Sequence, residues 1–229
     1  MIDIFEYWKD VDPRTLVHPE DRPFFDSNKH RLCLSCLPVP YYGPLKTAKI
    51  VLLYLNPGLT QRDIVAASDP TEQDFFWRQR QGYEYLRDQE GRKEKSWWFL
   101  RTKYFGLETE FIRKNLAVVQ LCAYHSQSFK DWSLLTKLPS CKVAFEWTQN
   151  FLIPQAKRGE RIVVCLRSPK YWGLEAGRKY EGQLFSPKTT RQGLALLSER
   201  AELVPAIKAF FADESRRLPD RLDRTRESK

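Results

Sequence analysis

The chain has 229 residues and a formal net charge of +9 at pH 7. Hydrophobic residues make up 42% of it and aromatic residues 14%, which excludes an intrinsically disordered chain and allows one domain of moderate size with a real core. No apolar run approaches the roughly 20 residues that a membrane-spanning helix needs, and the N-terminus lacks a secretory signal pattern. Five cysteines, an odd number among apolar neighbours, are typical of a reducing compartment. We therefore expect a cytoplasmic protein.

The positive charge favours a polyanionic partner such as nucleic acid. Part of it lies in the stretch "ESRRLPDRLDRTRESK" at the end of the chain. We interpret residues 1–212 as a single domain whose first 48 residues form an irregular wrap, and residues 213–229 as a charged tail.

Apolar runs and turn residues predict the order of the elements. Four short strands are expected at 50–55, at 116–122, within "ERIVVCLRSP" and within "EGQLFSP". Helical segments are expected after Thr60, at 70–81, at 94–106, at 140–154 with Ser140 as its cap and Pro154 as its stop, and at 195–211.

Strands that alternate with helices indicate an α/β fold of three layers, α/β/α, around a short and mostly parallel four-stranded sheet. In such folds, binding sites lie beyond the carboxyl ends of the strands. Three turns fall there: Asn56-Pro57-Gly58, His125-Ser126, and Ser186-Pro187, with Ser168-Pro169 as a rival to the last.

The run "LNPGLT" at 55–60 joins a buried strand to a helix start. The residue before a proline is held in an extended conformation, so Asn56 projects from the end of the strand. Gly58 has no Cβ and lets backbone approach a ligand. The structural alternative is that Asn56 only makes a turn.

The segment "AKIVLLYLNPGLT" resembles the first motif of the uracil-DNA glycosylase superfamily, most closely its mismatch-specific uracil/thymine branch. There a buried strand ends in Asn-Pro-Gly followed by a small hydroxyl residue. The pair Phe76-Trp77, the βα-like stretch "RIVVCLRSPKYWGLEAG" and the segment "QLFSPKTTR" extend the resemblance over roughly residues 48–212.

Three positions depart from the family pattern. Ser186 stands where the family has Asn or His in its second motif. The segment Lys188-Thr189-Thr190-Arg191 has no large apolar residue to wedge into a duplex. Tyr54 stands where the family usually has Gly, which implies a differently shaped pocket floor.

The resemblance implies hydrolysis of an N-glycosidic bond after a nucleotide is flipped from the stack. Asn56 is a neutral amide that can orient water but cannot deprotonate it, so the barrier must fall through stabilisation of charge. A readily departing base, such as uracil or an electron-poor modified pyrimidine, is therefore expected. His125 is the second catalytic candidate, since a neutral imidazole could donate to a base edge or a departing anion. The alternative for His125 is a loop histidine satisfied by backbone.

Further residues are assigned by the same resemblance. The expected substrate-binding residues are Tyr54, Leu55, Pro57, Gly58, Phe76, Gln120, Ser126 and Ser186. The expected DNA-binding residues are Lys188, Thr190 and Arg191, with solvated surface as the alternative. Phe75 and Phe76 are candidates for stacking on the base, with core packing as the alternative. Asp63, Asp69 and Asp74 could activate water, or each could simply belong to a helix start.

The pair Cys33-x-x-Cys36, with His30 nearby, resembles half a metal site. Some superfamily members carry an iron–sulfur cluster whose ligands begin with such a pair, but the spacing to Cys141 and Cys165 does not fit. We expect no metal and no cofactor.

The leading hypothesis is a monofunctional DNA glycosylase that acts on uracil-like or modified pyrimidines. A variant of it acts on hypermodified bases in foreign DNA, as a defence enzyme. A non-catalytic nucleic-acid-binding module on the same fold is the alternative. An unrelated nucleotide-binding protein is disfavoured by the lack of a P-loop and of a Gly-rich dinucleotide fingerprint.

Overall fold

The computed structural model describes residues 2–26, 29–88 and 96–217, and for 213–217 the backbone only. Within these ranges no helix combines the length and the apolar character needed to cross a membrane. Residues 213–217 of the predicted tail belong to the last helix, and residues 218–229 lie outside the described residues.

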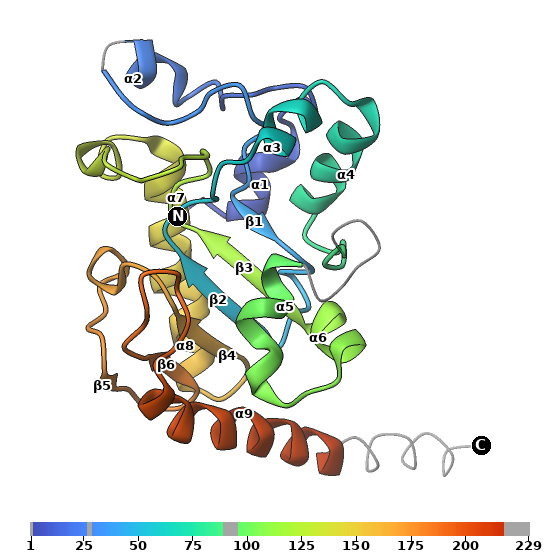
Figure 1. The fold of residues 1–229 in the computed structure, drawn as a ribbon, viewed down its shortest axis with the longest axis vertical. Helices are drawn as coiled ribbons and strands as arrows, with labels where there is room; N and C mark the ends of the chain where they lie inside the picture. Colours follow the sequence, from blue (N-terminus) through green and yellow to red (C-terminus); the bar gives the residue numbers. More distant parts are fainter. Residues whose placement is uncertain (1, 27–28, 89–95, 218–229) are drawn as a thin grey trace.

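A single mixed sheet forms the centre of the fold (Figure 1). Its spatial order is β1-β3-β2-β4-β6-β5, and the four inner strands β3, β2, β4 and β6 are parallel. The strands are β1 Tyr41–Tyr42, β2 Ile50–Tyr54, β3 Leu116–Gln120, β4 Ile162–Cys165, β5 Arg178–Lys179 and β6 Leu184–Ser186.

The α/β class is confirmed, but the expected count of four strands is wrong, because the sheet has six. The four expected strands are the four parallel ones. The two additional strands, β1 and β5, are antiparallel edge strands of two residues each. Two residues are too few to produce a periodic hydrophobic signal, so sequence patterns could not reveal them.

Alternate residues of β2 enter two separate cores, which explains why this strand is apolar throughout. Val51 and Leu53 belong to the first core, while Ile50, Leu52 and Tyr54 belong to the second. Since every residue of β2 is buried, both faces of the sheet must be covered.

Helices cover both faces (Figure 1). The first core is closed by α1 Ile4–Lys9, α7 Pro139–Trp147, the π-helical turn η4 Thr148–Leu152 and α8 Ile153–Lys157. The second is closed by α5 Trp97–Thr102, η2 Lys103–Phe105, α6 Thr109–Asn115 and α9 Leu197–Arg217. The remaining helical elements are α2 Arg22–Asp26, α3 Gln61–Ala66, α4 Pro70–Arg80, η3 Trp132–Leu134 and η5 Pro169–Trp172.

Two expected helix boundaries are wrong. Leu138, not Ser140, precedes the first turn of α7, and Pro139 occupies the start, where a missing N–H costs nothing. Pro154 does not stop the helix. The π-helical turn before it changes the hydrogen-bond pattern, so the helix continues into α8 with Pro154 in its first turn.

Leu52 lies at the centre of β2 and is fully buried. We expect Leu52→Ala to lower the free energy of unfolding by about 2–5 kcal/mol through lost burial and a residual cavity. Leu197→Ala is the matched control, because Leu197 is 80% exposed and its loss should change stability by less than about 0.5 kcal/mol. Urea unfolding measures the free energy of unfolding of both variants. Equal losses in the two variants would contradict the burial of Leu52 between the sheet and its helices.

Candidate functional site

The loops that follow β2 and β3 continue the pairing of these strands beyond their ends. The Cys122 N–H donates to the Leu55 carbonyl oxygen at 2.8 Å, and the Ser126 N–H donates to Pro57 at 3.2 Å. Gly58 and Ser126 form an isolated parallel bridge. The structure therefore brings the Asn56-Pro57-Gly58 turn and the His125-Ser126 turn together at one edge of the sheet.

The half-buried carboxamide of Asn56 connects these two loops. Its Nδ2 lies 2.9 Å from the Pro57 carbonyl oxygen, 3.1 Å from the Tyr124 carbonyl oxygen and 2.9 Å from Ser126 Oγ. Two of these partners are carbonyl groups, which only accept hydrogen bonds, so this side of the amide must be the nitrogen. Among the described residues no hydrogen bond reaches Oδ1, which leaves an oriented acceptor at the end of β2.

His125 is 5% exposed, and its Nδ1 lies 2.6 Å from the Gly58 carbonyl oxygen. Burial lowers the pKa of His125, although Asp63 and nearby backbone carbonyl groups act in the opposite direction. With its proton on Nδ1, the neutral ring donates to the Gly58 carbonyl oxygen. In this tautomer His125 holds the Asn56-Pro57-Gly58 turn, and the Leu37 carbonyl is a second backbone partner of the ring.

The three candidate acids all take part in local helix structure. Asp63 Oδ2 accepts hydrogen bonds from the Thr60 N–H at 2.6 Å and from Thr60 Oγ1 at 2.7 Å, which forms a capping box at α3. The Asp69 side chain caps α4, and Asp74 pairs with Arg78. Asp63 also comes within 3.8 Å of His125 Nδ1, so it is the only one of the three with a described contact to a candidate catalytic residue.

A buried polar network that sequence reasoning missed supports the Asn56 loop. The Tyr124 carbonyl accepts from Asn56, while the Tyr124 hydroxyl donates to Asp21 Oδ2 at 2.5 Å. Asp21 is fully buried and also accepts from the Ser140 N–H at 3.0 Å. Burial, with the nearby Asp21 carboxylate, raises the pKa of Tyr124, so the phenol keeps its proton and donates. Asp21 lies 103 residues before Tyr124, and no local pattern reveals such a pairing.

Tyr54 and Arg167 attach the predicted DNA-binding segment to the same sheet edge. The Tyr54 hydroxyl donates to the Gly193 carbonyl oxygen at 2.9 Å, and Arg167 donates to the Arg191 carbonyl oxygen. Gly193 has a φ of +76°, and a Cβ there would lie 2.9 Å from the Tyr54 ring, so only glycine fits. Tyr54 itself is buried in the second core and anchors the segment from beneath.

The predicted DNA-binding side chains are presented on the outside of this anchored segment. Lys188, Thr190 and Arg191 are all exposed. The Thr190 N–H donates to the Leu194 carbonyl oxygen at 2.8 Å, and the Lys188 N–H donates to Glu199 Oε2 at 3.1 Å. These backbone contacts fix the segment and leave the side-chain charges free to face solvent.

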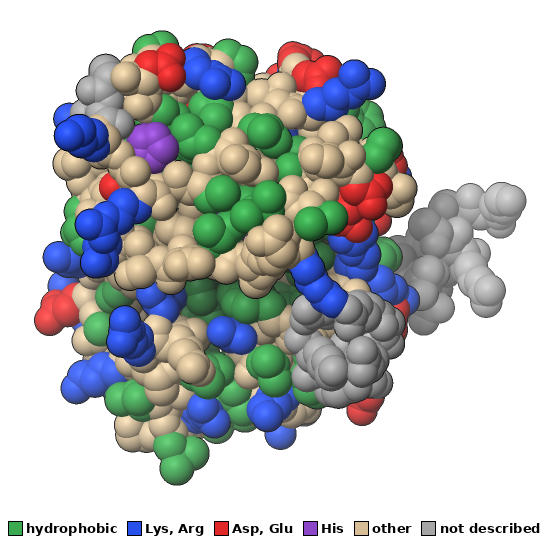
Figure 2. Space-filling view, turned by 45° about the horizontal axis from the view of Figure 1, so that its top comes forward, with side chains coloured by type: hydrophobic (Ala, Val, Ile, Leu, Met, Phe, Trp, Pro, Cys, Tyr) green, Lys and Arg blue, Asp and Glu red, His purple; other side chains and the backbone are tan. Residues whose placement is uncertain are grey.

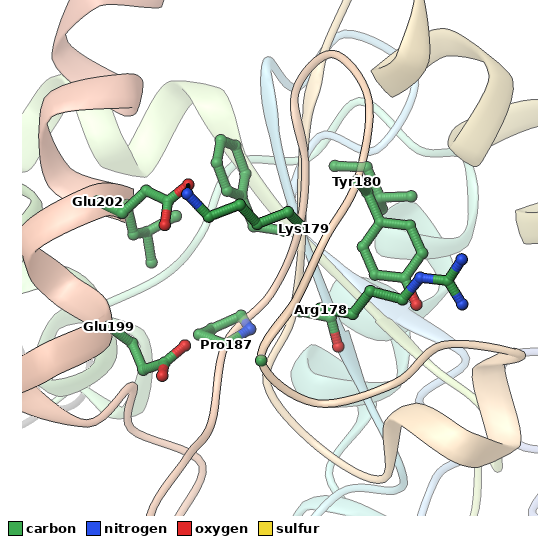
Figure 3. Close-up of a pocket in the computed structure, with 11 residues that line it drawn as sticks. Arg178, Lys179, Tyr180, Pro187, Glu199 and Glu202 are labelled. Carbon is green, nitrogen blue, oxygen red and sulfur yellow. Dashed lines mark ion pairs between the residues drawn. The ribbon is translucent and has the colours of Figure 1, made fainter.

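Ser186 ends β6 beside a hollow of about 60 Å³ between β5, β6 and α9. Figure 3 shows Glu199 and Glu202 of α9 facing Pro187 and Lys179 across this hollow, with Lys179 paired to Glu202 at 3.3 Å. Ser186 is 2% exposed, and its hydroxyl has no hydrogen-bond partner among the described residues. No described contact joins Ser186 to Asn56; β4 lies between β6 and β2 in the sheet.

Three further predicted substrate-binding residues, Leu55, Gln120 and Phe76, make no described hydrogen bond with Asn56. Leu55 is buried in the first core. Gln120 ends β3 at 6% exposure, and its Oε1 has no partner among the described residues. Phe76 is half-buried on α4 and makes an edge contact with Phe75, whose ring contacts Tyr42 of β1. No described contact connects Phe76 with Asn56.

The Cys33-x-x-Cys36 pair lies against the candidate site. The Cys33 N–H donates to the His125 carbonyl oxygen at 2.8 Å, and the two sulfur atoms lie 3.6 Å apart. Burial raises the pKa of Cys36 to about 12. Cys141 lies against Cys122 in the first core. Within the described ranges no group of three or more potential ligands could hold a metal ion.

The molecular surface is basic over the part that the structure describes. The residues outside that part contribute seven basic and five acidic side chains, so a net charge of +7 remains on the described residues. Figure 2 shows a face hollowed across its middle, and Lys and Arg predominate among the charged side chains of the lower half. A surface of this kind favours a polyanion.

Comparisons of the chain with protein-family models, with curated proteins and with solved structures each found no match. The family resemblance therefore depends on the motif at 48–60 and on the weaker segments that follow it.

The contacts of Asn56 predict the effect of a nearly isosteric change. In Asn56→Asp a carboxylate oxygen would face the carbonyl oxygens of Pro57 and Tyr124, and we expect the free energy of unfolding at pH 7 to fall by about 1–3 kcal/mol. Asn56→Ala should cost less, since it removes the donor without adding a repulsive oxygen. Urea unfolding of both variants provides the measurement. An Asp variant as stable as the wild type would refute the amide orientation.

The burial of His125 predicts a pH dependence. Its pKa is lower in the folded than in the unfolded protein, where it is about 6.5. Below that pH the unfolded state binds more protons, so stability falls by up to about 1.4 kcal/mol per pH unit as pH drops from 6.5 toward the folded pKa. His125→Gln should therefore lose less stability than the wild type between pH 7.5 and 5.5. Thermal unfolding at both pH values tests this, and an identical loss would contradict it.

Proposed function

We propose that this protein is a monofunctional DNA glycosylase that hydrolyses the N-glycosidic bond of a flipped uracil-like or modified pyrimidine nucleotide. The observation that carries the proposal is the orientation of Asn56. Its Nδ2 is engaged by three acceptors from two loops, so its Oδ1 is an acceptor of fixed direction at the carboxyl end of a central parallel strand. Sites of α/β sheets lie at this position.

The role assigned to Asn56 follows from its chemistry. Oδ1 accepts a hydrogen bond from a water molecule and aims a lone pair of that water at the C1′ carbon of the flipped nucleotide. The amide takes no proton, so the bond to the base breaks ahead of water attack and the base departs with the electron pair as an anion. The proton released from the water passes to solvent.

No carboxylate of the described site is arranged as a general base. The nearest candidate, Asp63, already accepts two hydrogen bonds from Thr60 at the start of α3. This arrangement suits a base that leaves as a stabilised anion and disfavours the two-carboxylate chemistry of ordinary glycosidases. It is the reason for proposing uracil-like or electron-poor modified pyrimidines as substrates, including the hypermodified bases of foreign DNA.

Phosphate contacts are assigned to the segment that carries Lys188, Thr190 and Arg191. It is anchored to the end of β2 through Tyr54 and Gly193, which brings its positive charges to the same edge as Asn56. Contacts of this kind position a nucleic acid without reading its sequence.

One observation favours the alternative of a non-catalytic DNA-binding module. Tyr54 fills the space beneath the anchored segment, and neither of the two described hollows is lined by Asn56. In that case Asn56 would serve only to join the loops after β2 and β3.

An excision assay separates the two functions. Purified protein is incubated with single-stranded and double-stranded oligonucleotides that carry one uracil, and with phage DNA that carries modified cytosines, followed by alkali to cleave abasic sites. We expect alkali-dependent breaks with at least one of these substrates. Asn56→Ala should reduce their rate about 100-fold or more, because the attacking water loses its orientation.

Asn150→Ala is the matched control, because Asn150 is an exposed asparagine of η4 whose amide donates to the Glu146 carbonyl oxygen and has no other hydrogen bond among the described residues. This variant should keep wild-type activity. Breaks that persist in Asn56→Ala would overturn the proposed role of Asn56, and DNA retention without breaks in the wild type would establish the binding module instead.

A further inference from the structure

An exposed tryptophan and a half-buried tyrosine form a stacked pair at the carboxyl edge of the sheet. Trp132 belongs to η3, after β3, and Tyr171 to η5, after β4. Their ring centroids lie 4.9 Å apart with an interplanar angle of 12°. Trp132 remains 41% exposed, although a stacked indole in a core would be covered.

The pair lines an open hollow of about 400 Å³. Its other lining residues are Ser168, Pro169, Lys170, Leu174, Glu175 and Ala176. A hollow of this size is within the range of small-molecule sites, and its wall is predominantly aromatic and aliphatic. It differs from the hollow beside Ser186, which is much smaller and is lined by charged residues of β5 and α9.

The elements that carry the two rings are fixed in place. The Arg31 N–H donates to the Asp131 carboxylate at 3.1 Å, which ties the residue before Trp132 to the N-terminal segment. Trp172, next to Tyr171, is fully buried. Ser168 has a φ of +53° and is the single non-glycine residue with a positive φ in the described ranges. Such a backbone conformation is unfavourable for a residue with a Cβ and is found where the surrounding structure holds a chain in a particular geometry.

One basic residue of the wall, Lys170, is placed beside the rings to contact a phosphate. Lys170 Nζ lies 4.8 Å from the Tyr171 ring centroid and is exposed. The acidic residue of the wall, Glu175, lies 3.9 Å from Arg178, so its charge is partly balanced. Stacked aromatic rings beside a lysine are the arrangement on which proteins bind unpaired bases.

The hollow lies close enough to Asn56 to share one strand of DNA with it. Trp132 follows Ser126, a hydrogen-bond partner of Asn56, by six residues. The Cα atoms of Ser126 and Trp132 therefore lie at most about 20 Å apart. That distance corresponds to about six stacked nucleotides at about 3.4 Å each. Tyr171 packs on the first core, on one face of the sheet. The segment that carries Lys188 and Arg191 is anchored on the second core, on the other face. The stacked pair and the basic segment therefore flank the end of β2.

We infer that Trp132 and Tyr171 form a stacking site for unpaired bases of single-stranded DNA that flank the nucleotide at Asn56. This inference rests on the proposed function for the identity of the ligand, and it extends that function by assigning an unpaired substrate strand. A base enters the hollow against the rings, and Lys170 contacts its phosphate.

Binding measurements without turnover test the inference. All proteins carry Asn56→Ala, and a fluorescein-labelled twelve-nucleotide oligothymidylate is titrated at constant salt by fluorescence anisotropy. We expect Trp132→Ala to weaken binding about tenfold or more, and Trp132→Phe, which retains a ring, to weaken it less than about threefold. For the duplex of the same length Trp132→Ala should leave the affinity unchanged, because its bases are paired and stacked.

Phe151→Ala is the matched control. Phe151 is 43% exposed and stacked on Trp147 at 5.4 Å, but it belongs to η4 beyond the far end of α7. Its removal should leave single-strand binding unchanged. Circular dichroism confirms that each variant is folded, and quenching of tryptophan fluorescence by the oligonucleotide should decrease in Trp132→Phe relative to its parent.

The outcomes are distinct from those of the excision assay. Single-strand binding that is unchanged in Trp132→Ala, equally weakened for the duplex, or equally weakened by Phe151→Ala would overturn the stacking site. Undetectable binding of the single strand by the parent protein would overturn it as well. Absence of alkali-dependent breaks, with single-strand binding that depends on Trp132, would refute the glycosylase proposal and leave the stacking site intact.

Discussion

The edge of the sheet is organised by one side-chain amide. Asn56 is the point at which the loops after β2 and β3 meet, and its nitrogen is held by carbonyl groups of both. Since an amide has distinct donor and acceptor ends, fixing the nitrogen also fixes the direction of the oxygen. The supporting Tyr124–Asp21 pair lies in the interior, where an unpaired polar group would be costly, so the loop cannot easily relax.

Local sequence patterns predicted most of the parallel core of this fold because β2, β3 and β4 are largely apolar runs buried on both faces. They could not predict β1 and β5, whose two residues carry no periodicity, or the passage of a helix through Pro154 after a π-helical turn. The turn at Asn56 and its approach to Ser126 follow from the rule that parallel strands end at one edge. The role of Asp21 could not be predicted from the sequence, because its partner Tyr124 is distant in the chain.

Tyr54, which departs from the pattern that the resemblance predicts, has a structural role in this chain. The resemblance predicts a small residue at position 54, but this chain has a tyrosine there, and its hydroxyl donates to the Gly193 carbonyl oxygen. The close approach requires glycine at that position, so the two residues are coupled. The basic segment is consequently tied to the central strand, and the geometry of the candidate site depends on a core side chain as much as on its surface residues.

The two short outer strands also determine how much unpaired backbone the sheet offers to another molecule. A long unpaired strand at a sheet margin is a template on which another chain can add, and this is a common origin of aggregation. Here both margins end in strands of only two residues, and β5 consists of exposed Arg178 and Lys179. A strand this short offers few unpaired backbone groups, and its charged side chains make the β5 margin a poor template for a strand of another molecule.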